Sequence, residues 1–429
     1  MYRKILEDLK NWKESVGRKP LILQGARQVG KTWAMLEFGK QCFENYVYIN
    51  FDENIEIKEL FETNKSATRL IERLTLIAGQ AIKPQKTLII FDEIQECSAA
   101  LNALKYFNEN AREYCVITAG SLLGTLLANP QSYPVGQVDM LRLYPLSFEE
   151  FLLNTNEKLY KAYEQCTDGK IEQIFATQLI ETYQNYLIVG GLPECVSAWI
   201  NTKDPQRVNS IQRNLIELYE NDIAKHNGKV NAGRILMVFR NIVTQLAKEN
   251  KKFIYGNVQS GARAREFEEA VEWLASSGLV YKVYESSNNQ YPLRAYDNLS
   301  AFKLYMFDIG LLKHMAGVEN ESIVLNSNFQ FRGAMTENYV LQQLYPILNV
   351  APTYFTFGHY ETDFLVQKGE KIVPIEVKSN ASVSSISLKA YIEKYNPQIA
   401  VRFSLLPFER QEKIVNIPLY FVEKMQKLL

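Results

Sequence analysis

The chain has 429 residues, and its 48 Lys and Arg balance its 48 Asp and Glu, so that the formal net charge is zero. This length exceeds what one hydrophobic core organises, so several domains are expected, and the zero charge excludes a global field for nucleic acid, leaving only local patches. Five cysteines and three histidines without disulfide or metal spacing, and the lack of a signal peptide or membrane-length apolar run, predict a reduced cytoplasmic protein with no membrane partner.

A glycine-bounded loop follows the first predicted strand. The apolar run at 20–23 leads into Gly25-Ala26-Arg27-Gln28-Val29-Gly30-Lys31-Thr32, and a helical segment begins at Trp33. This spacing fits G-x-x-x-x-G-K-[ST], the phosphate-binding P-loop, with a chance glycine turn as the alternative. The glycines let several backbone N–H groups point at an anion, and the helix N-terminus adds partial positive charge. We expect the loop to bind ATP, with Lys31 on the β- and γ-phosphates and Thr32 on Mg²⁺.

Two acids follow a second apolar run. The isoleucine-rich segment 87–91 predicts a buried parallel strand that ends in Asp92 and Glu93. Parallel sheets bind ligands at the carboxyl ends of their strands, so Asp92 is expected to hold Mg²⁺ and Glu93 to activate the attacking water. An exposed acidic turn is the alternative. The pair Asn64-Lys65 is followed by Ser66-Ala67 and not by a guanine-reading aspartate, which favours ATP over GTP, whereas a small-molecule kinase stays compatible with these residues.

A third apolar run at 115–119 predicts the next strand, and a small polar cluster ends it. In P-loop ATPases the strand beside the acidic one carries a polar sensor of the γ-phosphate. Ser121 is the preferred candidate for this role and Thr118 the second. The alternatives are a helix N-cap for Ser121 and a β-forming residue for Thr118, and the cap and sensor roles are compatible.

The spacing of strands predicts the architecture of the first part of the chain. Strands are expected near 20–24, 46–51, 87–91, 115–119 and 139–143. With helices between them, they predict an α/β fold over residues 1–153, a P-loop NTPase (AAA-like) domain whose parallel sheet is covered on both faces. Ser147 and Glu150 then fit a capping box at the start of a helix. Residues 154–228 are predicted to be helical, with a break at Gly190-Gly191-Leu192-Pro193-Glu194.

Residues 229–325 are predicted to form a winged-helix domain. Helical patterns at 235–239 and around 242–246 precede a third helix at 263–276 and a strand at 279–284. Arg263 and Arg265 lie at the start of the third helix, where recognition helices place basic residues near DNA. The alternative is a helical protein-contact module whose arginines are solvated.

Residues 326–429 hold a second set of candidate catalytic residues. Glu337 falls on the apolar stripe of the helical segment 334–344, where a carboxylate is costly unless it has a role. Strands are expected at 353–357, 362–366 and 371–378. Alternation along the last strand places Glu376 and Lys378 on one face, and the hairpin brings Asp363 toward Glu376.

This order of acids predicts a restriction-endonuclease-like α/β domain that hydrolyses phosphodiesters with Mg²⁺. Asp363 and Glu376 are the candidate metal ligands, because carboxylate oxygens suit Mg²⁺. Lys378 would orient or deprotonate the attacking water, and Glu337 would support the metal shell. A scaffold of the same fold that binds without cutting is the alternative.

With these residues in view, the chain resembles a widespread group of uncharacterised bacterial and archaeal AAA-type ATPases whose C-terminal half is a domain of unknown function. The resemblance covers nearly the whole chain, and besides the P-loop it rests on Phe91-Asp92-Glu93-Ile94-Gln95, Ala119-Gly120-Ser121, Tyr144-Pro145-Leu146-Ser147-Phe148-Glu149-Glu150-Phe151, Gly190-Gly191-Leu192-Pro193-Glu194, Phe307-Asp308-Ile309-Gly310-Leu311-Leu312 and Glu376-Val377-Lys378-Ser379. It implies an ATP-binding AAA-like module joined to a winged helix and a restriction-endonuclease-like fold. Related ATPases form homo-oligomeric rings, but where the group commonly reads Gly-Arg this chain has Gly136-Gln137, which leaves Arg142 as a weak candidate for an arginine finger.

The sequence therefore predicts an ATP-binding protein that hydrolyses ATP slowly when alone. Hydrolysis would reset the helical and winged-helix parts relative to the P-loop core. Two outputs are compatible with the residues: a nuclease acting on DNA, and a nucleotide-switched binding or regulatory module, with DNA or protein as partner, in which the nuclease-like fold is silent.

Overall fold

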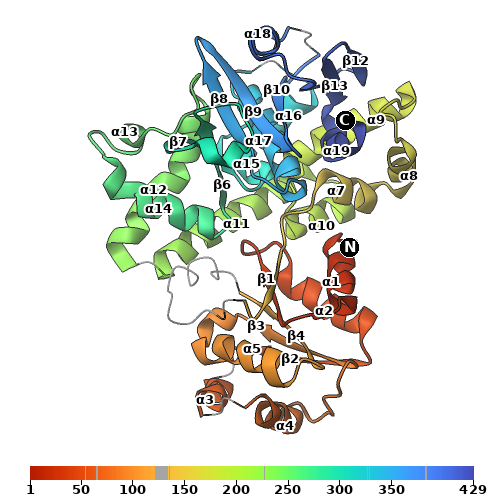
Figure 1. Cartoon of the computed structure of the whole chain (residues 1–429), viewed down its shortest axis with the longest axis vertical. Helices are drawn as coiled ribbons and strands as arrows, with labels where there is room; N and C mark the ends of the chain where they lie inside the picture. The colour runs from red at the N-terminus through yellow and green to blue at the C-terminus, as the bar shows by residue number, and fades with distance from the viewer. Residues whose placement is uncertain are drawn as a thin grey trace. The chain divides into compact units, whose positions relative to one another are not determined.

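The computed structural model describes residues 1–53, 55–63, 66–120, 134, 136–226, 228–325, 327, 329–381 and 384–429. The described chain divides into two compact units. The N-terminal unit comprises Tyr2–Tyr144 with Ser276–Gly278, and the C-terminal unit comprises Pro145–Ala275 and Leu279–Leu429 with Met1. In Figure 1 the first runs from red to orange and the second from yellow to blue.

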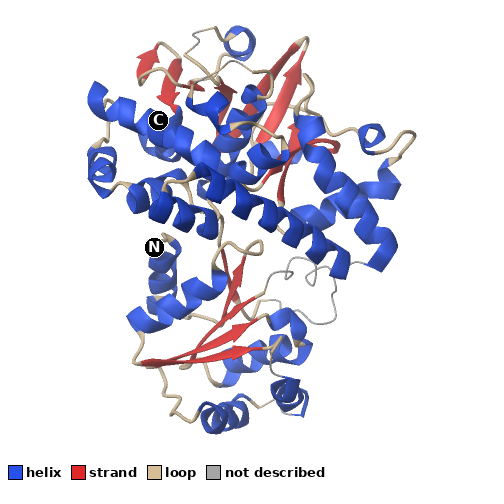
Figure 2. Cartoon of the chain, turned by 180° about the vertical axis from the view of Figure 1, so that it is seen from behind, coloured by secondary structure: helices blue, strands red, loops and turns tan. Residues whose placement is uncertain are grey.

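The N-terminal unit is a parallel α/β domain. It contains α1 (Ile5–Glu14), β1 (Leu21–Gln24), α2 (Lys31–Cys42), β2 (Asn45–Asn50), α3 (Ile55–Thr63), α4 (Ala67–Ala78), β3 (Thr87–Asp92), η1 (Ile94–Glu96), α5 (Ser98–Asn110), β4 (Cys115–Ala119) and β5 (Asp139–Arg142). The five strands lie in the order β2-β3-β4-β1-β5, and every pairing is parallel. Each strand begins and ends within one residue of its predicted bounds. The parallel pairings confirm the predicted parallel sheet, whose strands are drawn as red arrows in Figure 2.

Alternation along the strands fixes which side chains face the core. On β2, Val47 and Ile49 are buried in the cluster that covers one face of the sheet, whereas Tyr48 points to the other face. At the end of β3, the Phe91 ring packs edge-on against Phe61 at 5.4 Å and against Phe107 at 6.2 Å. Because aromatic pairs of this geometry stabilise a core beyond their buried area, they anchor the residue that follows, Asp92.

The C-terminal unit is built on one mixed sheet. Its helices are α7 (Phe148–Thr155), α8 (Glu157–Gln165), α9 (Gln173–Val189), α10 (Pro193–Thr202), α11 (Pro205–His226), α12 (Gly228–Leu246), α13 (Tyr255–Val258), α14 (Ala264–Ser276), α15 (Ile309–Met315), α16 (Asn320–Val324), α17 (Arg332–Leu344), α18 (Ile386–Tyr395) and α19 (Met425–Leu428). Its strands are β6 (Val280–Ser286), β7 (Asp297–Met306), β8 (Thr353–Phe357), β9 (Tyr360–Lys368), β10 (Lys371–Val377), β11 (Ala400–Ser404), β12 (Glu409–Gln411) and β13 (Ile414–Pro418). They lie in the order β12-β13-β11-β10-β9-β8-β6-β7.

The region predicted as a separate winged-helix domain shares this sheet. Its hairpin, β6 and β7, joins the strands of residues 326–429 through the parallel pairing of Glu285 with Tyr354. The patterns at 235–239 and 242–246 belong to one helix, α12, and not to two, because Ile235, Val238, Phe239, Ile242 and Leu246 form one continuous buried stripe. Apart from Ser276–Gly278, residues 229–325 therefore belong to the same compact unit as residues 326–429, and one sheet extends across the predicted division at 325.

The predicted capping box at Ser147 and Glu150 is confirmed. Ser147 caps α7, its hydroxyl accepting from the Glu150 N–H at 3.3 Å while the Glu150 carboxylate accepts from the Ser147 N–H at 2.9 Å. Four of the five cysteines are buried and all five are free thiols. Among the described helices, none is long and apolar enough to cross a membrane.

Two glycine-containing motifs, separated by more than a hundred residues, meet in the C-terminal unit. The Asp308 carboxylate accepts the Gly191 N–H at 2.7 Å and the Leu311 N–H at 3.1 Å, which caps α15. A Cβ at Gly190 would lie 2.3 Å from Asp308 Oδ1, and a Cβ at Gly191 would lie 2.2 Å from the Leu146 carbonyl oxygen. These motifs are therefore explained by close packing of three chain segments.

We expect Gly310→Ala to lower the free energy of unfolding by about 2–3 kcal/mol. The added Cβ would lie 2.6 Å from the Val189 carbonyl oxygen and 2.8 Å from the Gly190 nitrogen, and neither backbone atom is free to move. Gly233→Ala is the matched control, because that α12 glycine is exposed and its Cβ would meet nothing within 4 Å. It should stabilise by about 0.5–1 kcal/mol. Urea unfolding of both variants checks the opposite signs, and equal effects would contradict the packing argument.

The Asp308 carboxyl is expected to make stability depend on pH. Burial raises its pKa from 3.8 to about 6, although backbone N–H groups of Gly191, Leu311 and Gly310 oppose the rise. Because the pKa of Asp308 is higher in the folded protein than in the unfolded chain, its protonated carboxyl stabilises the fold below pH 4. This contribution to the free energy of unfolding, about 3 kcal/mol, is lost as the pH rises through 6. In urea unfolding from pH 4 to 7, the difference between wild type and Asp308→Asn should fall by that amount. A difference that stays constant over this range would refute the assignment.

Candidate functional site

The P-loop connects the end of β1 to the start of α2. A Cβ at Gly25 would lie 2.3 Å from the Leu143 carbonyl oxygen, so the loop leaves the sheet through a gap that only glycine fits. Gly30 has a φ of 94°, a left-handed conformation that glycine adopts without strain, and it directly precedes Lys31 at the N-terminus of α2. Gly25 to Thr32 thus form one loop around the positive end of a helix, as predicted.

The Lys31 ammonium is folded back onto its own loop. Its Nζ donates to the carbonyl oxygens of Gly25 at 2.9 Å and Ala26 at 2.8 Å, and the residue is 7% exposed. Carbonyl oxygens are weak partners for an ammonium compared with phosphate oxygens. The side chain is therefore held within the loop by bonds that a bound triphosphate would replace.

Thr32 and Asp92 meet at the carboxyl end of the sheet. The Thr32 hydroxyl donates to Asp92 Oδ2 at 2.6 Å, and the same oxygen accepts from the Tyr48 hydroxyl at 3.0 Å. A hydroxyl and a carboxylate are oxygen ligands of the kind Mg²⁺ binds, so these residues fit that ion. Burial and the Asp92 carboxylate raise the pKa of the Tyr48 hydroxyl above its usual range, which keeps it a hydrogen-bond donor.

Glu93 occupies a backbone conformation that few non-glycine residues adopt. Its φ is 49°, and its N–H donates to Asp92 Oδ1 at 3.0 Å. Its carboxylate accepts from Gln95 Nε2 at 2.5 Å. Residues held in sparsely populated conformations cluster at functional sites, which is consistent with a role for Glu93.

The structure describes some of the residues predicted to act as γ-phosphate sensor or arginine finger. Ser121 lies outside the described residues. Thr118 on β4 is fully buried, and its hydroxyl has no hydrogen-bond partner in the described part of the chain. β4 lies between β1 and β3, so this unpaired hydroxyl is on the strand that separates the P-loop from Asp92. The Gln137 side chain accepts from Asn108 at 2.6 Å, and Arg142 is exposed at the end of β5.

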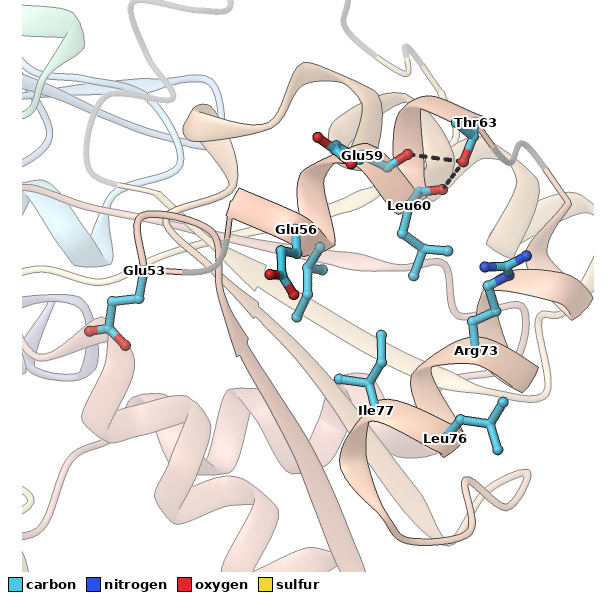
Figure 3. A pocket seen from close by; sticks show the side chains of 9 residues that line it. Glu53, Glu56, Glu59, Leu60, Thr63, Arg73, Leu76 and Ile77 are labelled. Atoms are coloured by element: carbon cyan, nitrogen blue, oxygen red, sulfur yellow. Dashed lines mark hydrogen bonds between the residues drawn. The ribbon is translucent and has the colours of Figure 1, made fainter.

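A groove of about 870 Å³ lies between α3 and α4, and none of its lining residues belongs to the P-loop. Leu60 and Ile77 point into it, as Figure 3 shows, with Leu76 at its edge. Leu76 and Ile77 are 81% and 55% exposed, which is high for apolar side chains. The remaining lining residues are Glu53, Glu56, Ile57, Glu59, Thr63 and Arg73. The groove is therefore a second surface of the N-terminal unit, distinct from the nucleotide loop.

The structure brings the four predicted residues of the C-terminal site together. Glu337 on α17 is 5% exposed, as its position on the apolar stripe predicted. Asp363 on β9 accepts the Val377 N–H at 2.7 Å, so it lies beside the end of β10. The Lys378 ammonium forms an ion pair with Glu376 Oε1 at 2.6 Å, which confirms that both side chains share one face.

The carboxylates of this centre influence one another. Burial raises the pKa of Asp363 well above its usual range, and the carboxylates of Glu337 and Glu376 add to the rise. Burial also raises the pKa of Glu376, against the opposing effect of Lys378. Oε2 of Glu376 is buried and has no partner among the described residues, so this oxygen is available to a cation.

A lysine outside the predicted set enters the same centre. The Lys251 ammonium forms an ion pair with Glu337 Oε1, and the Tyr305 hydroxyl donates to Glu337 Oε2 at 3.3 Å. Burial lowers the pKa of Lys251, the carboxylates of Glu337 and Asp363 raise it, and the outcome is a rise to about 12. Over the described ranges, no group of three or more His, Cys, Asp and Glu side chains has the arrangement of a metal site. Asp363 and Glu376 thus stay proposed ligands.

Sequence reasoning did not find Tyr48, Gln95, Tyr305 or Lys251. For Tyr48 a signal was present: in the alternating strand at 45–50 it stands on the face opposite to Val47 and Ile49, and a tyrosine there has a hydroxyl to place. Gln95 stands two residues after Glu93, inside the motif Phe91-Asp92-Glu93-Ile94-Gln95 that carried the resemblance, but no role was assigned to it. Lys251 and Tyr305 belong to no motif, because only the tertiary fold brings them to Glu337.

Family models match three segments of the chain. Residues 17–152 match an AAA domain, residues 180–322 a domain of unknown function (DUF8612), and residues 332–422 another domain of unknown function (DUF4143). No curated protein sequence is significantly similar to this chain. The N-terminal unit is therefore a P-loop ATPase-like domain of the AAA type, which confirms that part of the resemblance. The winged-helix and restriction-endonuclease-like assignments stay predictions.

The similarity of this chain to solved structures is low. A Walker-type ATPase of Pyrococcus abyssi is 14% identical over 72% of this chain and 94% of that chain, with a TM-score of 0.47. The Aeropyrum pernix ORC1 protein in complex with DNA is 11% identical over 74% and 91%, and AMPPCP-bound DnaA from Aquifex aeolicus is 12% identical over 63% and 86%, each with a TM-score of 0.27. Such similarity is too low to transfer a function, so the assignment rests on the domain match and the site.

Proposed function

We propose that the N-terminal unit binds ATP with Mg²⁺ and hydrolyses it. The hydrogen bond of 2.6 Å between the Thr32 hydroxyl and Asp92 supports this proposal, since it joins two oxygen groups of the kind that Mg²⁺ prefers. Thr32 and Asp92 would hold Mg²⁺, which would supply positive charge to stabilise the phosphates. In this chain, Lys31 would pass from the loop carbonyls to the phosphates, and Tyr48 would hold the Asp92 carboxylate in place.

Glu93 is the proposed general base for the attacking water. Gln95 supports this role, because its amide orients the Glu93 carboxylate through the bond of 2.5 Å. The unpaired Thr118 hydroxyl and Ser121 are the proposed γ-phosphate sensors on or after β4. A general base of this kind contributes about 10²–10⁴-fold to a rate.

Phosphate release from ATP and GTP tests this function. We expect release from ATP that stops when EDTA removes Mg²⁺, and slower release from GTP. The small-molecule kinase alternative predicts phosphate transfer to an added acceptor and almost no free phosphate. A protein that releases no phosphate from ATP at any Mg²⁺ concentration would refute the ATPase proposal.

We propose phosphodiester hydrolysis on DNA as a second function, at the centre formed by Glu337, Asp363, Glu376 and Lys378. The buried, unpaired Glu376 Oε2 beside Asp363 supports it, because it leaves an acceptor open to a divalent cation. Plasmid incubated with Mg²⁺ or Mn²⁺ should be nicked by wild type and not by Asp363→Ala. Equal nicking by both proteins would rule the centre out.

The competing proposal is a nucleotide-switched binding module in which this centre is silent. The ion pair between Lys251 and Glu337 favours it, since a carboxylate bound to a lysine is less available to a metal. It predicts salt-sensitive DNA binding that differs between ATP and ADP, without cutting. If neither nucleotide state binds DNA, a protein partner becomes the better account. Homo-oligomer formation stays a proposal that light scattering with ATP would test.

A further inference from the structure

Lys251 occupies the carboxylate centre from a segment outside the predicted motif. It lies between α12 and α13, and its side chain is 17% exposed, while that of its partner Glu337 is 6% exposed. Lys251 Nζ contacts Glu337 Oε1, and the Tyr305 hydroxyl contacts Oε2. Both oxygens of Glu337 are thus engaged by groups of the protein itself.

The two other carboxylates keep capacity for a cation. Asp363 uses Oδ2 to accept the Val377 N–H, and Glu376 uses Oε1 to bind Lys378. Glu376 is 5% exposed and its Oε2 has no partner in the described chain, which is costly for a buried carboxylate oxygen. The centre therefore has an open acceptor on one side and a lysine on the other.

The Lys251 ammonium supplies the positive charge that a metal ion would otherwise supply to Glu337. The neighbouring Lys303 is committed elsewhere, because it pairs with Glu361 at 2.5 Å and lies 4.5 Å from the centroid of the Tyr354 ring. Lys378 is committed to Glu376. A buried group of carboxylates needs positive charge, and an ammonium already present makes the entry of a second cation less favourable.

We propose that Lys251 is an internal counter-ion that takes the place of a divalent cation at this centre and competes with Mg²⁺ or Mn²⁺ for its carboxylates. The inference rests on the second function proposed above. On this proposal, Lys251 controls the affinity of the centre for divalent cations. The proposal also explains why a lysine binds carboxylates that occur in the order typical of a metal-dependent hydrolase.

Calorimetric titration of the full-length protein with MnCl₂ tests this inference. The heat that Asp363→Asn abolishes belongs to this centre, which separates it from the P-loop. We expect Lys251→Met to bind Mn²⁺ at least about tenfold more tightly than wild type, because the competing charge is gone. Lys252→Met is the matched control and should bind as wild type does. Mn²⁺ should also raise the melting temperature of Lys251→Met more than that of wild type.

The outcomes separate this inference from the function on which it rests. If Lys251→Met does not fold, Lys251→Gln replaces it, because the amide keeps a donor for Glu337 without the charge. If wild type binds Mn²⁺ at this centre and the Lys251 variants bind no more tightly, the inference about Lys251 is wrong while the cation centre stands. If none of these proteins gives an Asp363-dependent heat, both the cation centre and the Lys251 inference are overturned.

Discussion

Lys31→Ala is expected to weaken ATP binding by about 10²–10³-fold and to remove measurable hydrolysis. The Lys31 ammonium lies 2.9 and 2.8 Å from two loop carbonyl oxygens, and the residue is only 7% exposed. It is therefore a positive charge held within the loop, where it can reach bound phosphates. Alanine removes that charge and leaves the loop carbonyls facing an anion. Calorimetry with ATP and Mg²⁺ measures the loss.

Lys40→Ala is the control for this prediction. Lys40 lies in the last turn of the same helix, α2, and is exposed, so its removal changes the net charge equally without touching the loop. It should bind ATP as wild type does. If Lys31→Ala kept wild-type affinity, the segment 25–32 would not be a phosphate-binding loop, and the proposed ATPase would be wrong.

The N-terminal sheet could be predicted from local pattern alone. Each of its strands is a short apolar run bounded by polar or turn residues, and the strand–helix alternation admits few topologies. The acids Asp92 and Glu93 were located because the ends of such strands are where ligands bind. The capping box at Ser147 could also be predicted from the sequence, because a capping box involves only four adjacent residues.

The features that were missed depend on contacts between distant residues. Lys251 stands 86 residues before Glu337, in the run Lys248-Glu249-Asn250-Lys251-Lys252, which is typical of a solvated loop. Tyr48 stands 44 residues before Asp92. The pairing of β6 with β8, which joins the predicted winged helix to the C-terminal sheet, has no sequence signal either, because edge pairing is made through the backbone.

The same distinction explains the glycine motifs. Gly190-Gly191 and Phe307-Asp308-Ile309-Gly310 are short and specific, and they carry the resemblance to the AAA-type group. Their physical reason is a packing junction where one carboxylate binds two backbone N–H groups, and a pattern alone does not distinguish such a junction from a site of chemistry. The acids of the C-terminal centre differ, because Glu376 retains an unpaired oxygen and Asp308 binds backbone donors with both of its oxygens.

Glu93→Gln is expected to separate ATP binding from hydrolysis. The amide has the size of the carboxylate, and its carbonyl oxygen still accepts from Gln95, so the geometry around η1 should be kept. An amide does not accept a proton from water, so the rate of hydrolysis should fall by about 10²–10⁴-fold. Affinity for ATP should stay within about twofold of wild type, since neither Lys31, Thr32 nor Asp92 changes.

Single-turnover hydrolysis and ATP calorimetry on the same samples check both halves of this prediction. Glu96→Gln serves as the control, because Glu96 is exposed in the same short helix and its substitution changes the charge equally. A Glu93→Gln protein that hydrolyses ATP at the wild-type rate would show that another group activates the water. The strained φ of 49° would then serve only to hold the Asp92 carboxylate through the Glu93 N–H, at 3.0 Å. Loss of ATP affinity in Glu93→Gln would instead show that Glu93 helps to bind the nucleotide or Mg²⁺. Asp92 would then not be the only acid that holds the ion.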